Sequence, residues 1–433
     1  MIRYLFTSLT LILTLASFPL LAADERLSFK RGSVTSLPFG GAINEVFVLD
    51  VFDVDDDGTD DLAVSGKVKN GKQSPVHTFI IRNNTDTGKP QVIDLGEAGL
   101  TRSTWSGKFY RETNGQVYFV HGRNGEGFGM EYAERASIFR VTPADGTFAV
   151  EAVYELQSPH FTASVERCDI DGDATAEIYI NNYGHPDGDE FNAPQIVQMK
   201  NGQFVETDVT RWYAATGRHG ANNSITFADI DGDGDCDLLS AMEAAKWQTS
   251  ALTFPGEVGA FAVLNANGKL DGNAIAVPNP HFGDDNGAFS FEMLNQGSDR
   301  LFFVHSSAYE GPNGQNFHDN FLQAYRYLDG AFVEVTDEVI DKQFAMWSAN
   351  QRWVRFEDID RDGDSDLYFS GYTGDIAIYR NLGGKFRREI VLKDPGGGSM
   401  GVAFLSNPTT KCSDLVIARR DGKLSRYVCH LQD

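Results

Sequence analysis

The sequence predicts an all-β fold, a seven-bladed β-propeller with four-stranded blades. A strand–loop–strand unit recurs seven times along the chain, and two further strand signals lie between consecutive units. The spacing of the units, roughly 50 to 65 residues, is typical of a repeat architecture. Four-stranded units arranged around an axis bury their faces against one another. A set of separate β-sandwiches is the weaker alternative, because the repeat count favours one ring.

The N-terminal segment is predicted to be an export signal. Arg3 precedes an apolar stretch from Leu5 to Leu21, which ends in two alanines ahead of the first acidic residues. An uncleaved membrane anchor is the weaker alternative, because small residues close the stretch and no basic stop-transfer cluster follows it. We expect residues 1–23 to be removed and residues 24–433 to form one propeller domain. The mature chain is then secreted or periplasmic, with no transmembrane segment.

Four of the units carry a complete acidic loop. Its first, third, fifth and ninth positions are Asp or Glu, and three of the four copies have glycine at position 6; the copies span residues 53–62, 169–178, 229–238 and 358–367. Weaker copies without the full acidic set occur around residues 114–120, 296–303 and 411–417. Strand-like runs flank each loop, so the loop is predicted to join two neighbouring strands of a blade.

The last unit is predicted to be closed by the other end of the chain. It ends at Asp433 after only three strand signals, whereas residues 26–31 resemble the fourth-strand segment at residues 385–388. A strand from the mature N-terminus would cover the open edge that three strands leave.

The four cysteines are placed where disulfides can form in an exported protein. Cys412 and Cys429 flank a predicted hairpin that turns at Asp421-Gly422, in near-opposite positions, and we expect them to pair. Cys168 and Cys236 lie in or beside equivalent loops of neighbouring units. The spacing leaves open whether these two pair or remain free thiols.

Charge limits the partners of the chain. There are 61 acidic against 37 basic residues, which gives a net charge of -24. A broad basic surface for phosphates is therefore not expected, and nucleic acid is excluded as the partner. We expect a monomer that binds a glycan or an extracytoplasmic protein.

The acidic loops are predicted to bind a cation. Carboxylates about 4 Å apart near a protein surface repel by roughly 4 kcal/mol per pair. All ligands are hard oxygens, which favours Ca²⁺ over Zn²⁺ or copper. An EF-hand is excluded, because position 12 is Val64, Ile180, Ser240 or Phe369 instead of Glu and strands flank the loop. An acidic turn that only contacts solvent would explain a single copy, but it explains four copies in register poorly.

These loops, the Asn-Gly-x-Phe turns such as the one at residues 201–204, and the seven units resemble the FG-GAP/VCBS repeat proteins, which include the propeller of integrin α chains. The resemblance covers essentially the whole mature chain. It implies up to four calcium sites with the ligands Asp53, Asp55, Asp57 and Asp61; Asp169, Asp171, Asp173 and Glu177; Asp229, Asp231, Asp233 and Asp237; Asp358, Asp360, Asp362 and Asp366. Ala174 and Glu177 depart from the pattern, so the site in the third blade is the least expected of the four. The second, fifth and seventh blades lack the loop.

The connections at the opposite ends of the strands are predicted to bind the ligand. They are long in blades two to five, and long loops are disproportionately functional. They carry histidines, aromatic residues and arginines at equivalent positions, which we expect on exposed loops: His121, Arg123, His160, Tyr183, His185, Arg218, His219, Trp247, His305, Tyr309 and Trp347.

Two classes of function fit this face. The first is a module that binds a glycan or a protein without chemistry. The alternative is a lyase acting on an acidic polysaccharide, in which Arg neutralises the carboxylate and His or Tyr abstracts the neighbouring proton. No Ser-His-Asp order, HExxH, P-loop or dinucleotide fingerprint is present. Binding is favoured, and convergence of His121, His185, His305 and an Arg into one pocket would instead favour the lyase.

Overall fold

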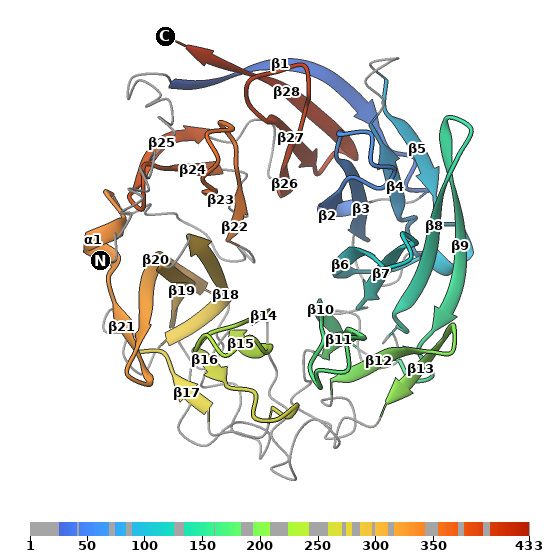
Figure 1. The fold of residues 1–433 in the computed structure, drawn as a ribbon. Helices are drawn as coiled ribbons and strands as arrows, with labels where there is room; N and C mark the ends of the chain where they lie inside the picture. Colours follow the sequence, from blue (N-terminus) through green and yellow to red (C-terminus); the bar gives the residue numbers. More distant parts are fainter. Residues whose placement is uncertain are drawn as a thin grey trace, which may run out of the picture.

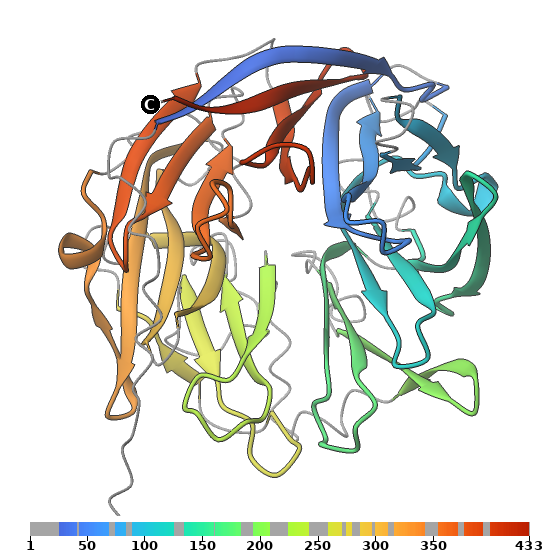
Figure 2. The ribbon, with the colours of Figure 1, turned by 45° about the horizontal axis from the view of Figure 1, so that its top comes forward.

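The fold is described from a computed structural model. It describes residues 26–40, 43–68, 74–83, 89–124, 134–159, 161–182, 194–207, 224–241, 259–270, 274–278, 286–296, 299–310, 316–342, 354–370, 376–392 and 399–432. The strands of these residues form seven four-stranded antiparallel sheets arranged as the blades of a ring, which confirms the seven-bladed propeller (Figure 1). Figure 2 shows the blades arranged around a central axis.

The first three blades follow one another directly along the chain. Blade 1 contains β2 (Ile43–Phe52), β3 (Asp61–Val68), β4 (Phe79–Arg82) and β5 (Gln91–Asp94); blade 2 contains β6 (Thr104–Arg111), β7 (Val117–Arg123), β8 (Ser137–Ala144) and β9 (Thr147–Glu155); blade 3 contains β10 (Thr162–Cys168), β11 (Glu177–Asn182), β12 (Gln195–Lys200) and β13 (Gln203–Thr207).

The next three blades repeat this order. Blade 4 contains β14 (Ser224–Ala228), β15 (Asp237–Ala241), β16 (Ala260–Val263) and β17 (Ala274–Ala276); blade 5 contains β18 (Asn286–Gln296), β19 (Asp299–Glu310), β20 (Asn316–Leu328) and β21 (Ala331–Glu334); blade 6 contains β22 (Arg355–Glu357), β23 (Asp366–Ser370), β24 (Ile376–Asn381) and β25 (Phe386–Leu392). Two short helical turns, η1 (Glu97–Gly99) and α1 (Thr336–Val339), accompany the outer strands of blades 1 and 5.

Blade 7 combines the two ends of the chain. It contains β26 (Ser399–Leu405), β27 (Asp414–Arg419) and β28 (Lys423–Gln432), and its outer strand is β1 (Arg26–Ser36). β1 pairs antiparallel with β28 in a register that places Leu27 opposite Leu431 and Phe29 opposite Cys429. The two strands lie side by side in Figures 1 and 2. Closure by the N-terminal strand is therefore confirmed.

Hydrophobic side chains between neighbouring blades form the cores. Between blades 1 and 2, for example, Phe47 and Ala63 pack with Phe109 and Phe119. The middle strands are buried on both faces, since each blade lies between two others: every residue of β24 and all but one of β3 are buried. Burial of each such aromatic side chain contributes about 1.5–3 kcal/mol.

The inner strands of neighbouring blades are joined by a repeated hydrogen bond that the sequence analysis did not anticipate. The backbone N–H groups of Val165, Ile225 and Val354 donate to the hydroxyls of Ser106, Ser164 and Ser290 in the preceding blades, at 2.9, 3.1 and 3.1 Å. Blade 7 has Gly401 near Val48 of blade 1, where a Cβ atom would lie 2.2 Å from the Val48 nitrogen. Small residues are needed here because the two backbones approach closely.

Two disulfides add covalent links. Cys412 and Cys429 are bonded within blade 7, with their Cα atoms 5.7 Å apart. Cys168 and Cys236, whose pairing the sequence left open, are also bonded, with a Cα separation of 6.3 Å. The second disulfide joins the ends of the acidic loops of blades 3 and 4.

The predicted export signal, residues 1–23, lies outside the described residues. Within the part of the chain that is described, no helix has both the length and the apolar character needed to cross a membrane.

Candidate metal centres

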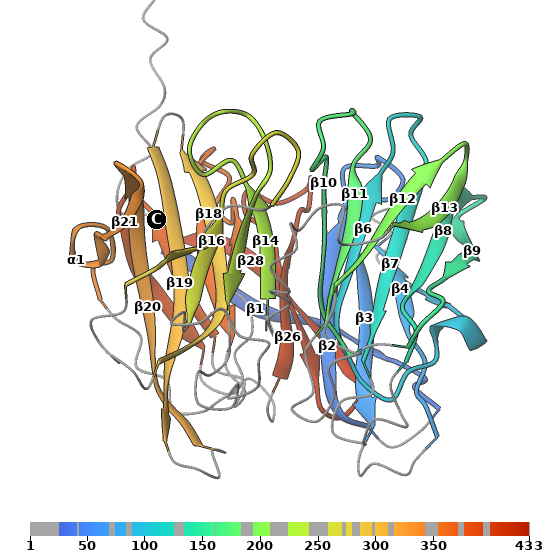
Figure 3. The same cartoon turned by 90° about the horizontal axis from the view of Figure 1, so that it is seen from below.

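The acidic loops all connect the first and second strands of their blades. They lie between β2 and β3, β10 and β11, β14 and β15, and β22 and β23. Because all these strands run in the same sense around the ring, the four loops lie on one face of the disc. Figure 3 shows the loops of blades 3 and 4 together at its upper edge. We refer to this face as the acidic face.

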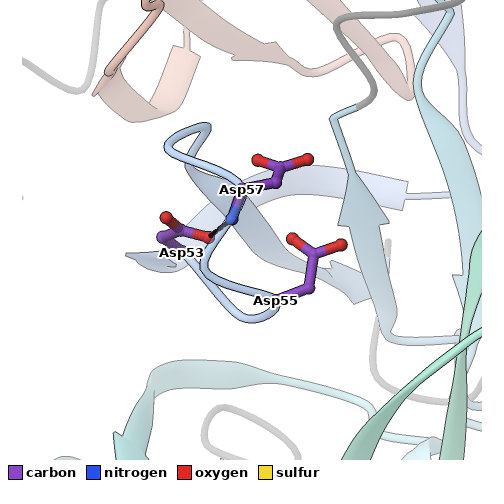
Figure 4. Close-up of side chains that lie close together, drawn as sticks. All are labelled: Asp53, Asp55 and Asp57. Carbon is purple, nitrogen blue, oxygen red and sulfur yellow. Dashed lines mark hydrogen bonds between the residues drawn. The ribbon is translucent and has the colours of Figure 1, made fainter.

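Three carboxylates converge in each loop. In each group every residue offers one oxygen, and these oxygens lie within 4.8 Å of one another: Asp53, Asp55 and Asp57; Asp169, Asp171 and Glu177; Asp229, Asp231 and Asp237; Asp358, Asp360 and Asp362. Figure 4 shows the group of blade 1. Asp173, Asp233, Asp61 and Asp366 were also expected as ligands and fall outside these groups.

The backbone of each loop turns through two residues in the left-handed region. At position 6, Gly58, Gly234 and Gly363 have φ values of 81°, 94° and 98°. Ala174 takes the same conformation in blade 3, with φ 67°, at a cost of about 1–2 kcal/mol. The departure from glycine in blade 3 therefore leaves the loop geometry intact. In blade 1 the turn directs the N–H groups of Asp57 and Gly58 to the carboxylate of Asp53, at 3.1 and 2.9 Å.

The acid at position 9 anchors the loop to its blade. In blade 1, Asp61 is fully buried and accepts backbone hydrogen bonds from Val54 at 3.1 Å and from Asn83 at 2.9 Å. Asp366 of blade 6 accepts the same pair from Ile359 at 3.0 Å and Asn381 at 2.8 Å. Burial raises the pKa of both carboxyls to about 8. Position 9 is thus a structural residue of the loop as well as an expected ligand.

The chemistry of the groups fits a hard cation. The side chain of Asp55 is 8% exposed, and its Oδ1 is buried with no hydrogen-bond donor among the described residues. Asp358 Oδ1 is in the same situation. A buried carboxylate oxygen without a partner is costly, and neighbouring carboxylates add repulsion. An oxygen-binding divalent cation such as Ca²⁺ would satisfy both needs, with the three carboxylates of each group as its ligands.

The loops of blades 3 and 4 are also bound to each other. The Asn265 amide donates to Ile170 O in the blade 3 loop at 2.8 Å and to Cys236 O in the blade 4 loop at 3.3 Å. The disulfide between Cys168 and Cys236 joins the same two loops. Each cysteine directly precedes an expected ligand, Asp169 or Asp237, so the two candidate centres form one covalently connected unit.

The expected ligand-binding histidines are not loop side chains where the structure describes them. His121 lies in β7, is fully buried, and has its Nε2 3.3 Å from Thr78 Oγ1. Burial lowers its pKa well below the usual value, with a further contribution from Arg123. His305 lies in β19, is 1% exposed, and packs against Phe289 with a ring separation of 5.4 Å. The expectation that both are exposed is wrong. In each case the strand continues past the histidine, so the side chain belongs to the blade and not to the loop that follows.

Arg123 is held by the framework of blade 2. Its guanidinium donates to Leu100 O at 3.2 Å and to Glu155 at 2.6 Å, and its side chain is 11% exposed. Tyr309 lies in β19. The other candidates fall outside the described residues: His160, Tyr183, His185, Arg218, His219, Trp247 and Trp347.

A second charged cluster, which the sequence analysis missed, lies on the inner strands. Lys108 Nζ is 2.5 Å from Glu166 of the next blade, and Thr226 donates to Glu292 at 2.9 Å. Arg355 donates across to Val48 O at 3.2 Å. Asp50 belongs to the same cluster, since its carboxyl interacts with Lys108 and Arg355. A charged residue stands three positions before the first aspartate in three of the four acidic loops: Asp50, Glu166 and Arg355. This recurrence is the signal that would have revealed the cluster.

Glu292 in this inner-strand cluster is expected to make stability depend on pH. Burial and nearby Glu166 raise its pKa to about 8, although Lys108 and Arg355 partly oppose the shift. A raised carboxyl pKa stabilises the fold at low pH, and this contribution is lost as the pH rises through about 8. Glu292→Gln, which stays neutral, should therefore be more stable than the wild type above that pH, by about 1–3 kcal/mol.

Urea unfolding measured between about pH 5 and pH 9 tests this expectation. The matched control is Glu338→Gln in α1, where the carboxylate is 66% exposed. The control should leave the pH profile of the wild type unchanged. Identical profiles for the wild type and Glu292→Gln would show that Glu292 is ionised throughout this range.

No family model and no curated protein matches this sequence. Among solved structures, the N-terminal domain of Nup159 is similar over 94% of this chain and 96% of its own, at 10% identity and a TM-score of 0.49. Sqt1 of Saccharomyces cerevisiae is similar over 93% of this chain and 99% of its own, at 9% identity and a TM-score of 0.48. At these values neither likeness says anything about the role of this chain. Its seven four-stranded antiparallel sheets in themselves make the chain a seven-bladed β-propeller.

Proposed function

We propose that this protein is an exported, calcium-stabilised binding module of the FG-GAP/VCBS type. Its ligand, a glycan or an extracytoplasmic protein, docks on the face opposite the acidic face. The observation that carries the calcium part is the convergence of three carboxylates in each of four loops, with a buried, unpartnered Asp55 oxygen in one of them. Calcium acts structurally, by fixing loops that connect the inner and middle strands of four blades.

The topology supports the assignment of the ligand to the opposite face. The connections that leave the second strands start there, after Arg123 in blade 2, Asn182 in blade 3, Ala241 in blade 4 and Glu310 in blade 5. Most of the expected aromatic and basic residues belong to these connections or to those that enter the first strands. The acidic face carries a high density of negative charge, which repels acidic glycans.

Binding is favoured over lyase chemistry. The lyase needs His121, His185, His305 and an Arg in one pocket, whereas His121 and His305 are buried in blades 2 and 5. These blades stand apart in the ring (Figure 1). No observation on the described residues favours the lyase, and we do not propose it.

An array of neutral and uronic polysaccharides, probed with the full chain in the presence of calcium, tests the proposal. Retention without release of ultraviolet-absorbing unsaturated products is expected for a glycan-binding module. Hydroxyl-radical footprinting of the retained complex should then protect the connections after Arg123 and Ala241 and leave residues 53–61 and 229–237 as reactive as in the free protein. Protection centred on the acidic loops would reverse the assignment of the faces.

A further inference from the structure

The four acidic loops differ in the residue that reaches them from the third strand of the blade. In blade 1, Arg82 at the end of β4 donates from Nε and Nη2 to the same oxygen, Asp55 Oδ2, at 2.9 and 2.5 Å. In blade 6, Arg380 of β24 donates from Nε to Asp360 Oδ2. Asp55 and Asp360 both occupy position 3 of their loops. The same contact is therefore built twice, in blades that are far apart in the sequence.

The next residue completes the contact in both blades. Asn83 donates its backbone N–H to Asp61 at 2.9 Å, and its side-chain amide donates to Asp60 O. Asn381 donates its backbone N–H to Asp366 at 2.8 Å, and its side-chain amide donates to Ser365 O at 3.1 Å. An Arg-Asn pair thus holds positions 3, 8 and 9 of the loop at once.

Blades 3 and 4 lack the arginine at this position. The strand register places Gln198 in blade 3 and Leu264 in blade 4 where blades 1 and 6 have Arg82 and Arg380. Gln198 donates its amide to Glu177 at 2.6 Å, and so contacts position 9. In blade 4 the asparagine is kept, since Asn265 donates its backbone N–H to Asp237 at 2.7 Å. An arginine does reach this loop, but it comes from the next blade and contacts position 1: Arg300 donates to Asp229 Oδ2 over a longer distance, 3.3 Å.

In blade 1 the arginine leaves one aspartate oxygen for a cation, whereas in blade 6 the second oxygen of Asp360 accepts a 3.3 Å hydrogen bond from the Asp362 backbone N–H. Both Arg82 donors use Asp55 Oδ2, while Oδ1 is buried and accepts no hydrogen bond from the described residues. The guanidinium itself is fixed, because it lies over the Phe148 ring of blade 2 with 5.5 Å between Cζ and the ring centre. A ligand carboxylate whose second oxygen is held by a fixed donor is pre-oriented for the metal, and loss of such a donor typically weakens metal binding 10- to 100-fold.

We infer that Arg82 and Arg380 are positioning residues for calcium, so that the loops of blades 1 and 6 bind the ion more tightly than the loops of blades 3 and 4. This inference rests on the proposed calcium binding. The calcium affinities of the four centres are then ordered by a contact from outside the loop, and not by the loop sequence alone. A guanidinium near a cation also repels it. If the arginine orients the aspartate, its removal weakens calcium binding, and if it acts only through its charge, its removal strengthens calcium binding.

Isothermal titration of the calcium-stripped full chain with CaCl2 tests the inference. The wild type should show two tighter and two weaker sites. Arg82→Gln should weaken one of the tighter sites about 10- to 100-fold, and Arg380→Gln the other. Arg82→Lys, which keeps the charge without the two-donor fork, should lie between the wild type and Arg82→Gln.

The matched control is Arg111→Gln. Arg111 contacts the same loop at Asp53 O and at the Asp56 carboxylate, 2.8 and 2.9 Å away, and touches no carboxylate of the Asp53, Asp55 and Asp57 group. Removing it takes away the same charge, so calcium affinity should stay equal or rise. If Arg82→Gln behaves like this control, the positioning role is overturned.

Two further results decide the remaining cases. Circular dichroism first establishes whether each variant is folded. If Arg82→Gln is not folded, the calcium affinities of Arg82→Lys and Arg380→Gln, each compared with the wild type and with Arg111→Gln, test the inference. A wild-type chain that takes up no calcium and melts at the same temperature with and without it overturns the proposed function together with this inference. A wild type that binds calcium, with variants of unchanged affinity, overturns this inference alone.

Discussion

Chelation of calcium is expected to lower the melting temperature of the protein by roughly 5 °C or more. At an affinity of about 10⁻⁴ M, millimolar calcium stabilises the fold by roughly 1.4 kcal/mol per site. Four sites with this affinity on average would then contribute about 5–6 kcal/mol. The physical reason is the convergence of carboxylates in each loop, which repel one another until a cation binds. Calorimetry of the chelated chain with calcium added back stepwise measures the effect.

Two controls make this result specific. Magnesium should restore little of the lost stability, because it demands a smaller octahedral site and gives up its water reluctantly. Asp57→Asn should reduce the calcium-dependent part of the melting shift, whereas Asp56→Asn should not, since Asp56 lies outside the carboxylate group and is 73% exposed. A melting temperature that is unchanged after exhaustive chelation would remove the basis for calcium at these loops.

Deletion of residues 26–36 is expected to abolish cooperative unfolding and to cause aggregation. β1 is the outer strand of blade 7, so its loss exposes the edge of β28. An unpaired strand edge is a template for pairing with other chains. The deletion also removes Leu27 from the core that it shares with Ile359 and Phe404. Size-exclusion chromatography with light scattering and calorimetry of the deleted chain report both effects.

Point variants in β1 separate the loss of packing from the exposure of the β28 edge. Leu27→Ala should cost about 2–5 kcal/mol because the side chain is 5% exposed. Val34→Ala should change stability by less than about 0.5 kcal/mol, since Val34 is 44% exposed. A monomeric deletion variant as stable as the full chain would mean that β1 does not close the ring in solution.

Local sequence patterns were sufficient for the architecture. The acidic loop between two strand-like runs, repeated at regular spacing, located the second strands of the blades, and the match between residues 26–31 and 385–388 identified the closing strand. Turns and strand alternation depend on neighbouring residues, so the sequence encodes them directly. For the same reason the sequence singled out all four groups of carboxylates, since each group lies within one loop.

Contacts between separate strands and blades could only be decided by the tertiary structure. The sequence placed His121 and His305 on exposed loops, but the strands extend past them and both side chains are buried. It left the partners of Cys168 and Cys236 open, and it gave no sign that Arg82 and Arg380 reach position 3 of the loops. These contacts depend on strand register and on how far one blade lies from the next. Both are set by packing around the ring, which no local stretch of sequence contains.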